Sequence, residues 1–347
     1  MIDKTMRAVM FHGPKEIRLE EIPIPSPGPD EILLRISAAL TCGTDFKAFR
    51  QGHPVLLRSL PAPFGHEFSG TVAKVGEGVT RFPPGTRIVA ANSAPCDGCF
   101  YCDRDENQLC ENMKLLNGAY AEYLLLPANI VKRNSYVIEE GTSFETAALS
   151  EPFSCALHAV DVTDVKKGDT VAVIGAGIMA RFLLEAVKAR GAETIVIGRS
   201  PEPLVMMASL GASSTVSILD SDPIAAVKKW TNGHGVDCVF EAVGTAETWH
   251  QSIAMVRKGG KVCLFGGCKK GTEVPIDAHR VHYGQLSLYG VFHHKPRYFE
   301  KALQLLSTGR ISTDGLIEGS IGLDDVPRFF EERHERSNLK STVTPHA

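Results

Sequence analysis

Short apolar runs alternate with polar residues and prolines in the first third of the chain. The runs at residues 32–36 and 70–75 are rich in aliphatic and β-branched side chains, which favour β-strands. Between and around them stand Pro23, Pro25, Pro27, Pro29, Pro83 and Pro84. Because proline interrupts regular structure, this spacing predicts a β-rich domain of short strands.

The pattern changes at about Lys166. Apolar runs that predict strands at residues 170–174, 194–197, 238–241 and 261–265 are separated by stretches with helical periodicity, including residues 178–189 and 203–210. Strands that alternate with helices predict a parallel, doubly wound sheet, so the fold class is α/β. A further helix is expected at residues 296–306, and the polar stretch after it predicts an irregular tail.

Length and charge narrow the class of protein. The chain has 347 residues, enough for about two domains, with 44% hydrophobic and 22% charged residues. A net charge of -3 supplies no basic field, so we expect a small-molecule substrate and neither nucleic acid nor membrane as partner. The longest apolar run, residues 171–180, is far short of the roughly 18 residues that span a bilayer. With no secretory leader recognisable in residues 1–18, the expected location is the cytoplasm.

Four cysteines lie close together in the sequence at Cys96, Cys99, Cys102 and Cys110. Four thiolates on a short loop suit a closed tetrahedral zinc site, which has no open position for substrate and is therefore structural. An iron–sulfur cluster is the alternative, although Glu111 stands where such motifs usually have proline. A disulfide knot is a weaker alternative, because the nine cysteines are odd in number and cytosolic thiols stay reduced.

A glycine-rich turn follows the predicted strand at residues 170–174. Gly175 permits a tight turn, Gly177 allows close approach of a pyrophosphate, and the small Ala180 allows close packing of the helix that begins there. The helix N-terminus favours phosphate. This arrangement predicts a dinucleotide site; the alternative is a glycine-rich turn in a sheet that binds no ligand.

The end of the next strand bears on the choice of cofactor. NAD-binding enzymes usually place a carboxylate there to bind the adenosine ribose, but this chain has Gly198, Arg199 and Ser200. A missing acid removes repulsion of a 2′-phosphate, and the arginine and serine can bind that phosphate. The sequence therefore favours NADP over NAD; the alternative is that Arg199 stacks on adenine and the cofactor is NAD.

A second set of possible metal ligands is dispersed along the chain. Cys42, His66, Glu67 and Glu151 offer a thiolate, an imidazole and carboxylates, which are the donors of an open catalytic zinc site. Each residue taken alone has an ordinary explanation, such as a buried cysteine, a core histidine or a glutamate at a helix start. Together they predict a catalytic metal centre.

These motifs resemble the zinc-dependent medium-chain dehydrogenase/reductase family, closest to its sorbitol (polyol) and threonine dehydrogenase branch. The resemblance covers the whole chain and rests on Gly65-His66-Glu67, Gly70, Gly76, Val79, Cys42-Gly43-Thr44-Asp45, Glu151-Pro152, the four-cysteine lobe and the glycine-rich turn. It implies a GroES-like catalytic domain in residues 1–155, a Rossmann domain in residues 156–290 and a return to the catalytic domain in residues 291–347.

The resemblance also implies roles for residues around the catalytic zinc. Cys42, His66 and Glu151 hold the metal, and Glu67 is either a fourth or exchanging ligand or a partner of the zinc-bound water. Thr44 accepts the alcohol proton, and Asp45 orients His66 by accepting its second ring N–H. Relatives commonly carry histidine two residues after this aspartate, whereas this chain has Lys47, which leaves the end of the proton relay open.

Cofactor and substrate contacts follow from the same resemblance. The expected cofactor contacts beyond Gly175, Gly177 and the 198–200 segment are Ile178, Met179, Val243, Gly244, Phe265, Gly266, Gly267, Val291, Phe292 and His293. The expected substrate contacts are Lys47, His293 and His294. Two solvated loop histidines are the alternative for the last pair.

The expected activity is a zinc-dependent, NAD(P)-linked dehydrogenase that oxidises a secondary alcohol of a polyol, cyclic polyol or sugar derivative to a ketone. Zinc acts as a Lewis acid on the alcohol, and hydride moves to the nicotinamide. Two zincs per chain and a homodimer or homotetramer are expected. The alternatives are a non-catalytic dinucleotide-binding zinc protein, a threonine or amino-alcohol dehydrogenase of the same family, and a zinc-free reductase of this fold.

Overall fold

The computed structural model describes residues 4–53, 56–57, 59–333 and 339–346. The chain folds into two compact units: unit 1 comprises residues up to Ser154 together with Lys295 onwards, and unit 2 comprises Cys155–His294. The division falls after residues 154 and 294, where the resemblance places domain boundaries after 155 and 290. Helix α4 (Ser150–Val162) passes from the first unit into the second.

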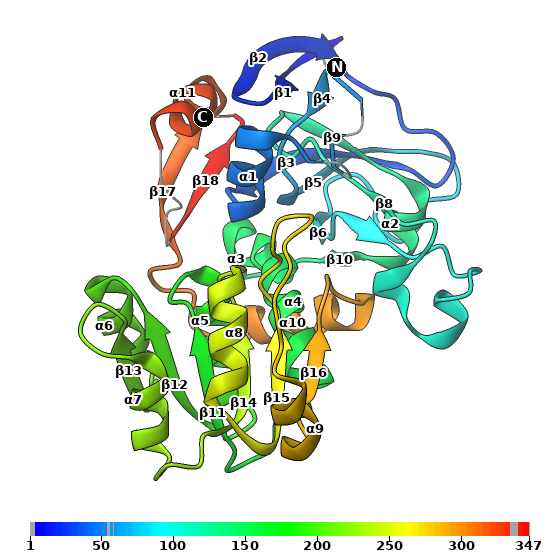
Figure 1. The fold of residues 1–347 in the computed structure, drawn as a ribbon. Helices are drawn as coiled ribbons and strands as arrows, with labels where there is room; N and C mark the ends of the chain where they lie inside the picture. The colour runs from blue at the N-terminus through cyan, green and yellow to red at the C-terminus, as the bar shows by residue number, and fades with distance from the viewer. Residues whose placement is uncertain (1–3, 54–55, 58, 334–338, 347) are drawn as a thin grey trace. The chain divides into compact units, whose positions relative to one another are not determined.

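Unit 1 is built on a seven-stranded sheet, as the short runs of the first third predict (Figure 1). Its strand order is β10-β6-β5-β3-β18-β17, with β9 also paired to β3. The strands are β3 (Ile32–Leu40), β5 (Glu67–Val75), β6 (Arg87–Ala90), β9 (Tyr123–Leu126), β10 (Ser135–Val137), β17 (Ile317–Gly322) and β18 (Lys340–Thr344). The central β3–β5 pair is antiparallel and ends where Leu40 faces Glu67, so Cys42 and His66 come close together just beyond it.

Smaller elements complete unit 1. Two further sheets are β2-β1-β4 and β7-β8, formed by β1 (Thr5–Gly13), β2 (Glu16–Pro23), β4 (Ala62–Pro63), β7 (Ser93–Ala94) and β8 (Lys114–Leu115). The helices are α1 (Gly43–Gln51), α2 (Ala128–Arg133), α3 (Phe144–Ala148), α10 (Pro296–Ser307) and α11 (Val326–Glu332). One apolar core joins Phe46 and Phe49 of α1, Phe68 of β5 and Phe330 of α11. The sheet and the helix that carries Cys42 therefore share a core.

The predicted irregular tail after the 296–306 helix is wrong. Strands β17 and β18 pair in parallel, and β18 also pairs antiparallel with β3 through Val343–Ala39 and Thr342–Leu40. The strand Lys340–Thr344 contains four polar residues among its five, yet the first four of the five are buried. The hydrophobic pattern missed it because its polar side chains are buried against partners that only the folded sheet supplies.

Unit 2 is a six-stranded parallel sheet in the order β13-β12-β11-β14-β15-β16, which confirms the doubly wound sheet (Figure 1). The strands are β11 (Thr170–Ile174), β12 (Glu193–Gly198), β13 (Ser214–Ser217), β14 (Val236–Glu241), β15 (Val256–Leu264) and β16 (Ser287–Gly290). The helices are α5 (Ile178–Lys188), α6 (Pro201–Ser209), α7 (Pro223–Trp230), α8 (Ala246–Met255) and α9 (Ala278–Gly284). No helix within the described residues is long and apolar enough to cross a membrane.

The strand order of unit 2 places the ligand-binding edge. The chain reverses its direction of progress across the sheet between β11 and β14, and in open α/β sheets ligands bind outside the carboxyl ends of the strands at such a point. Gly175 follows β11 with φ of 118°, a backbone conformation that strongly favours glycine. The glycine-rich turn therefore lies at the switch point of the sheet.

Candidate metal centres and cofactor site

The start of helix α1 positions Cys42. The Cys42 sulfur accepts from the Thr44 amide at 3.5 Å, and the Asp45 carboxylate accepts from the Cys42 amide at 3.0 Å. The Cys42 side chain also accepts from the Asp45 amide, and together with the bond from the Cys42 amide this forms a reciprocal capping box, which satisfies amides that a helix end would otherwise leave unpaired. The run Cys42-Gly43-Thr44-Asp45 therefore has a local structural role as well as a chemical one.

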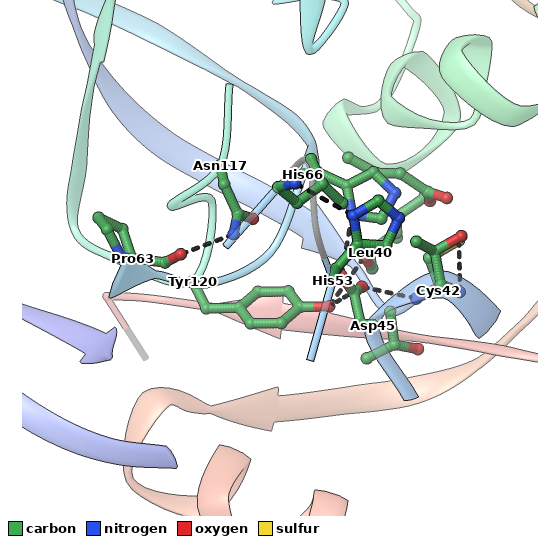
Figure 2. Close-up of polar contacts among 12 residues, drawn as sticks. Leu40, Cys42, Asp45, His53, Pro63, His66, Asn117 and Tyr120 are labelled. Carbon is green, nitrogen blue, oxygen red and sulfur yellow. Dashed lines mark hydrogen bonds and ion pairs between the residues drawn. The ribbon is translucent and has the colours of Figure 1, made fainter. Parts of the chain in front are cut away.

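Asp45 also holds His66. The Asp45 Oδ1 atom lies 2.8 Å from Nδ1 of His66, and both side chains are buried (Figure 2). Burial alone lowers the pKa of His66, but attraction and hydrogen bonding from Asp45 raise it well above its usual 6.5. This hydrogen bond on Nδ1 leaves Nε2 as the ring nitrogen for a metal, an arrangement common around zinc-ligating histidines.

The second Asp45 oxygen has a partner that the sequence did not indicate. The Tyr120 hydroxyl donates to Asp45 Oδ2 at 2.6 Å, and Figure 2 shows it pointing toward this carboxylate. Burial raises the pKa of Tyr120 well above 10, and the charge of Asp45 adds to the rise, so the hydroxyl remains a donor. No spacing or motif connects these residues, which lie 75 positions apart.

Glu67 forms a fully buried ion pair. The Lys340 ammonium lies 2.7 and 2.6 Å from the two Glu67 oxygens and 3.1 Å from the Thr41 carbonyl oxygen. The Lys340 and Glu67 side chains are 2% and 0% exposed, so each neutralises the other away from water. Lys340 was not among the predicted site residues, because it lies in the segment expected to be irregular.

Glu151, in the first turn of α4, has no such compensation from an ion pair among the described contacts. Burial raises the pKa of Glu151 to about 7, and repulsion by Glu67 adds to the rise. The charges that act on its carboxyl include those of His66, Lys340 and Asp45, so Glu151 lies within electrostatic range of these residues. A divalent cation would favour its ionised form.

The donor atoms fit a metal. Cys42, His66 and Glu67 each offer one ligand atom, and these sulfur, nitrogen and oxygen atoms lie within 4.8 Å of one another.

The residues predicted to move the alcohol proton lie in helix α1. Thr44 is half-buried in the first turn of α1, two residues beyond Cys42, and Lys47 follows in the same helix. Burial and the charges of His66 and Lys47 lower the pKa of His53, and the charge of Asp45 raises it, so His53 lies within electrostatic range of these residues. His53 was not among the predicted site residues.

The four-cysteine lobe forms a second cluster. The sulfur atoms of Cys96, Cys99, Cys102 and Cys110 all lie within 4.8 Å of one another, and the Cys99 and Cys110 sulfurs are 3.9 Å apart. Tetrahedral zinc with Zn–S bonds of about 2.3 Å separates its sulfurs by roughly 3.8 Å, so the cluster fits that ion. None of the nine cysteines, all of which lie within the described residues, forms a disulfide.

Backbone amides prepare the lobe for a cation. Hydrogen bonds from the amides of Cys102 and Glu111 lower the pKa of Cys99 to about 6, which favours the thiolate. Burial raises the pKa of Cys110 to about 12, so binding of a cation there must release a proton. Lys295 and Arg297 pair with Asp105, which ties the lobe to the start of α10.

In unit 2 the predicted cofactor residues gather at the carboxyl ends of the parallel strands. Gly175, Gly177, Ile178 and Met179 follow β11; Val243 and Gly244 follow β14; Phe265, Gly266 and Gly267 follow β15; Val291, Phe292 and His293 follow β16. Gly177 is the N-cap of α5 and has no side-chain cap, so the first amides of this helix are available to a phosphate. This cradle fits a dinucleotide.

The 198–200 segment ends β12 at the same edge. A Cβ atom on Gly198 would lie 2.8 Å from that of Ala176 and 3.0 Å from Leu204. The glycine-rich turn therefore leaves no space for a carboxylate at residue 198, and an Asp there would require this turn to shift. Arg199 and Ser200 are exposed, and Ser200 is the N-cap of α6. The polar groups that could meet a ribose phosphate are thus Arg199 and Ser200.

The buried residue Glu241 connects the loops after β14 and β15. Glu241 Oε1 accepts at 2.8 Å from the amides of Val243 and Gly244, and the Glu241 carbonyl oxygen accepts from the amides of Phe265 and Gly266. Thr248 also donates to Oε1, at 2.8 Å. Glu241 was not predicted, because a single glutamate at a strand end carries no recognisable spacing.

The last predicted loop contains His293 and His294. His293 adopts a left-handed backbone conformation with φ of 57°, and its carbonyl oxygen accepts from His158 Nδ1 at 2.8 Å. Phe292 is 60% exposed, whereas His294 is buried. The hydrogen bond to α4 thus fixes the backbone at the residue expected to meet substrate.

Comparison with known proteins places these features in a family. A GroES-like sheet domain with two clusters of metal-binding donors, joined to a dinucleotide-binding domain, defines a metal-dependent nicotinamide dehydrogenase. Residues 28–135 match the alcohol dehydrogenase GroES-like domain and residues 166–308 match the zinc-binding dehydrogenase domain. The chain belongs to the zinc-dependent medium-chain alcohol dehydrogenase family. It is therefore a zinc-dependent oxidoreductase that uses a nicotinamide cofactor.

Individual relatives match over nearly the full chain. Sorbitol dehydrogenase of Bacillus subtilis (strain 168) is 30% identical, with 99% of this chain and 98% of the relative covered. D-arabinitol dehydrogenase 1 of Uromyces fabae is 29% identical, with coverage of 98% and 97%. A protein of Sinorhizobium meliloti 1021 solved bound to NADP has a TM-score of 0.92 and 30% identity, with coverage of 99% and 100%.

A substitution in the four-cysteine lobe should lower the stability of the protein more than its catalytic activity. Cys99→Ser is expected to lose one zinc per chain and to lower Tm by ~5 °C or more, because a closed structural site contributes folding energy. The specific activity of the folded fraction should fall far less than in Cys42→Ser. Metal analysis, thermal unfolding and activity measure these effects. A folded Cys99→Ser protein with full metal content and full stability would contradict the closed-site interpretation.

Removal of the Lys340 ammonium should strongly destabilise unit 1. Lys340→Met leaves the Glu67 carboxylate buried without its counter-ion, and a broken buried pair costs about 3–5 kcal/mol of unfolding free energy. Urea unfolding of the zinc-loaded chain measures this loss. Lys166→Met, which breaks the exposed pair with Asp164, is the control and should leave the unfolding free energy nearly unchanged. Equal effects of the two substitutions would show that Glu67 does not depend on Lys340.

Proposed function

We propose that Cys42, His66 and Glu151 hold a catalytic zinc and that the four-cysteine lobe holds a second, structural zinc. The observation that carries the first site is the difference between its two carboxylates. Lys340 neutralises Glu67, whereas burial and the charge of Glu67 disfavour ionisation of Glu151. A divalent cation would supply the missing positive charge to Glu151. Glu67, which is already paired with Lys340, would support these ligands rather than be one of them.

The proposed reaction is reversible oxidation of a secondary alcohol to a ketone. Zinc supplies Lewis-acid polarisation of the alcohol oxygen. Asp45 keeps the His66 ring in the orientation and tautomer that leave Nε2 to the metal. Thr44 accepts the hydroxyl proton of the substrate, and the half-buried Lys47 and His53 of this region are the polar groups that can take it further. We also propose that the domain boundaries fall after residues 155 and 290. The proposed assembly is a homodimer or homotetramer.

The proposed cofactor is NADP. Gly198 places no carboxylate against a 2′-phosphate, and packing against Ala176 and Leu204 excludes one without movement of the backbone. Arg199 and Ser200 offer a cation and a hydroxyl at the adjoining positions. The Sinorhizobium meliloti relative, solved bound to NADP, supports the same choice.

Loss of the Arg199 guanidinium should reduce use of NADP selectively. Arg199→Ala is expected to lower kcat/KM for NADP by about tenfold, because a charged hydrogen bond contributes about 1.5 kcal/mol or more, and to leave kcat/KM for NAD little changed. Arg190→Ala, which removes an arginine paired with Asp161 in the same unit, is the control. Steady-state kinetics with both cofactors measure the effect. Equal or better use of NAD by the unmodified enzyme would refute the assignment.

The proposed substrate is a polyol, a cyclic polyol or a sugar derivative. Relatives named for sorbitol and D-arabinitol support this class. The proposed Glu151 ligand gives the zinc an oxygen donor beside the sulfur and nitrogen donors, and such a donor set suits a substrate that binds through neighbouring hydroxyls. Lys47 places a positive charge near the centre, and this charge could bind an anionic group of the substrate. A substrate screen should therefore include phosphorylated and otherwise anionic polyols.

His293 should discriminate between polyols and simple alcohols. His293→Ala is expected to raise KM for polyols about three- to tenfold, because one hydroxyl loses a hydrogen-bond partner, and to change KM for a simple secondary alcohol much less. His234→Ala, at an exposed position of the same unit, is the control. The screen covers simple alcohols, polyols, polyol phosphates and amino alcohols including threonine. Better activity on simple aliphatic alcohols than on every polyol and sugar derivative, with His293→Ala indifferent to the difference, would refute this substrate class.

A further inference from the structure

Tyr120 contacts the proposed catalytic zinc site through both its hydroxyl and its ring. Its hydroxyl donates to Asp45 Oδ2 at 2.6 Å and lies 3.3 Å from the Leu40 carbonyl oxygen. Its ring lies directly over Gly65, where an added Cβ would be 2.6 Å from the Tyr120 Cδ1 atom. Gly65 also has φ of 88°, so this position requires glycine both for its backbone conformation and for the ring that covers it.

The segment that carries Tyr120 is fixed to the segment that carries His66. The amides of Gly118 and Ala119 donate to the Gly65 carbonyl oxygen at 2.7 and 3.0 Å, and the amide of Tyr120 donates to the Phe64 carbonyl oxygen at 2.9 Å. The ring packs edge-on against Phe64, with ring centroids 5.7 Å apart. Tyr120 is 0% exposed, so water cannot replace its hydroxyl at Asp45.

The Asp45 carboxylate makes hydrogen bonds with two of the proposed metal ligands, His66 and Cys42. Its Oδ1 atom meets His66 Nδ1 at 2.8 Å, and its Oδ2 atom accepts from the Cys42 amide at 3.0 Å. A carboxylate can rotate about its Cβ–Cγ bond, and such rotation would break both contacts together. The Tyr120 hydroxyl gives Oδ2 its shortest contact and so opposes that rotation (Figure 2).

We propose that Tyr120 is a positioning residue for the catalytic metal: its hydroxyl locks the Asp45 carboxylate in the orientation that aligns His66 and Cys42. The inference rests on the proposed zinc site at these residues and goes beyond it, since Tyr120 is neither a proposed metal ligand nor a proposed substrate contact. A tyrosine 75 residues away from Asp45 thereby controls how firmly the metal is held. The supporting groups around a metal ligand commonly change metal affinity by about 10- to 100-fold.

The test is Tyr120→Phe, which keeps the ring over Gly65 and removes only the hydroxyl. Zinc release to an excess of a chelator is followed for the chain loaded with two metals, and the visible spectrum is recorded with cobalt at the Cys42 and His66 site. We expect one of the two metals to leave about tenfold faster, with an altered cobalt spectrum and little change in Tm. Tyr136→Phe is the matched control, because the Tyr136 hydroxyl bonds only the Pro296 carbonyl oxygen at 3.3 Å among the hydrogen bonds described.

A double-mutant cycle shows whether the hydroxyl acts through Asp45. In an Asp45→Asn background, Tyr120→Phe should add little to the rate of metal release, since the group that it positions has already changed. An unchanged release rate and cobalt spectrum in Tyr120→Phe, or an equal acceleration in both backgrounds, would overturn the inference and leave the proposed function standing. A single metal per unmodified chain, bound only by the cysteine lobe, would overturn both.

Discussion

The proposed catalytic centre depends on one buried carboxylate, that of Asp45. Asp45 accepts hydrogen bonds from the Cys42 amide, from His66 and from Tyr120, which lie at a helix start, directly before strand β5 and in a distant loop, respectively. In a buried site each of these bonds is stronger than in water, and each lost partner leaves a costly unpaired group. The first turn of α1 brings the carboxylate to the centre, because Asp45 is the third residue of this helix and its side chain completes the capping box with Cys42. Local helix chemistry and metal chemistry therefore require the same side chain.

Charge compensation distinguishes the remaining carboxylates. Glu67 and Lys340 form a pair that excludes water, and the Lys340 ammonium also reaches the carbonyl oxygen of Thr41, the residue before Cys42. The pair is thus a structural link between the last strand and the two segments that carry the proposed ligands. Glu151 lacks an equivalent cation among the described contacts, and burial raises its pKa to about 7. A site with one compensated and one uncompensated carboxylate is suited to bind a divalent cation through the second.

In unit 2 buried polar groups fix the backbone of the loops that carry the predicted cofactor contacts. The loops after β14 and β15 bond to the side chain and the carbonyl oxygen of Glu241, respectively. The Trp249 ring N–H donates to the Gly266 carbonyl oxygen at 3.0 Å, which adds a second tie to the same loop. A cofactor that meets preorganised amides pays little ordering entropy on binding, whatever the sequence of the loop. This explains why the glycine-rich turn is readable in the sequence while its supports are not.

The sequence by itself determined the class of fold, and it indicated the two groups of candidate metal ligands and the glycine-rich turn. Each of these depends on local patterns: strand and helix periodicity, cysteine spacing, and glycines where a turn needs them. Only the tertiary structure brought Lys340, Tyr120 and Glu241 to the sites, because each is a single polar residue whose partner lies far away in the chain or in another loop. The polar strand that carries Lys340 was expected to be irregular for the same reason. Its side chains are buried by pairing with β3, whose residues lie some 300 positions earlier in the chain, and no local pattern of hydrophobicity records that contact.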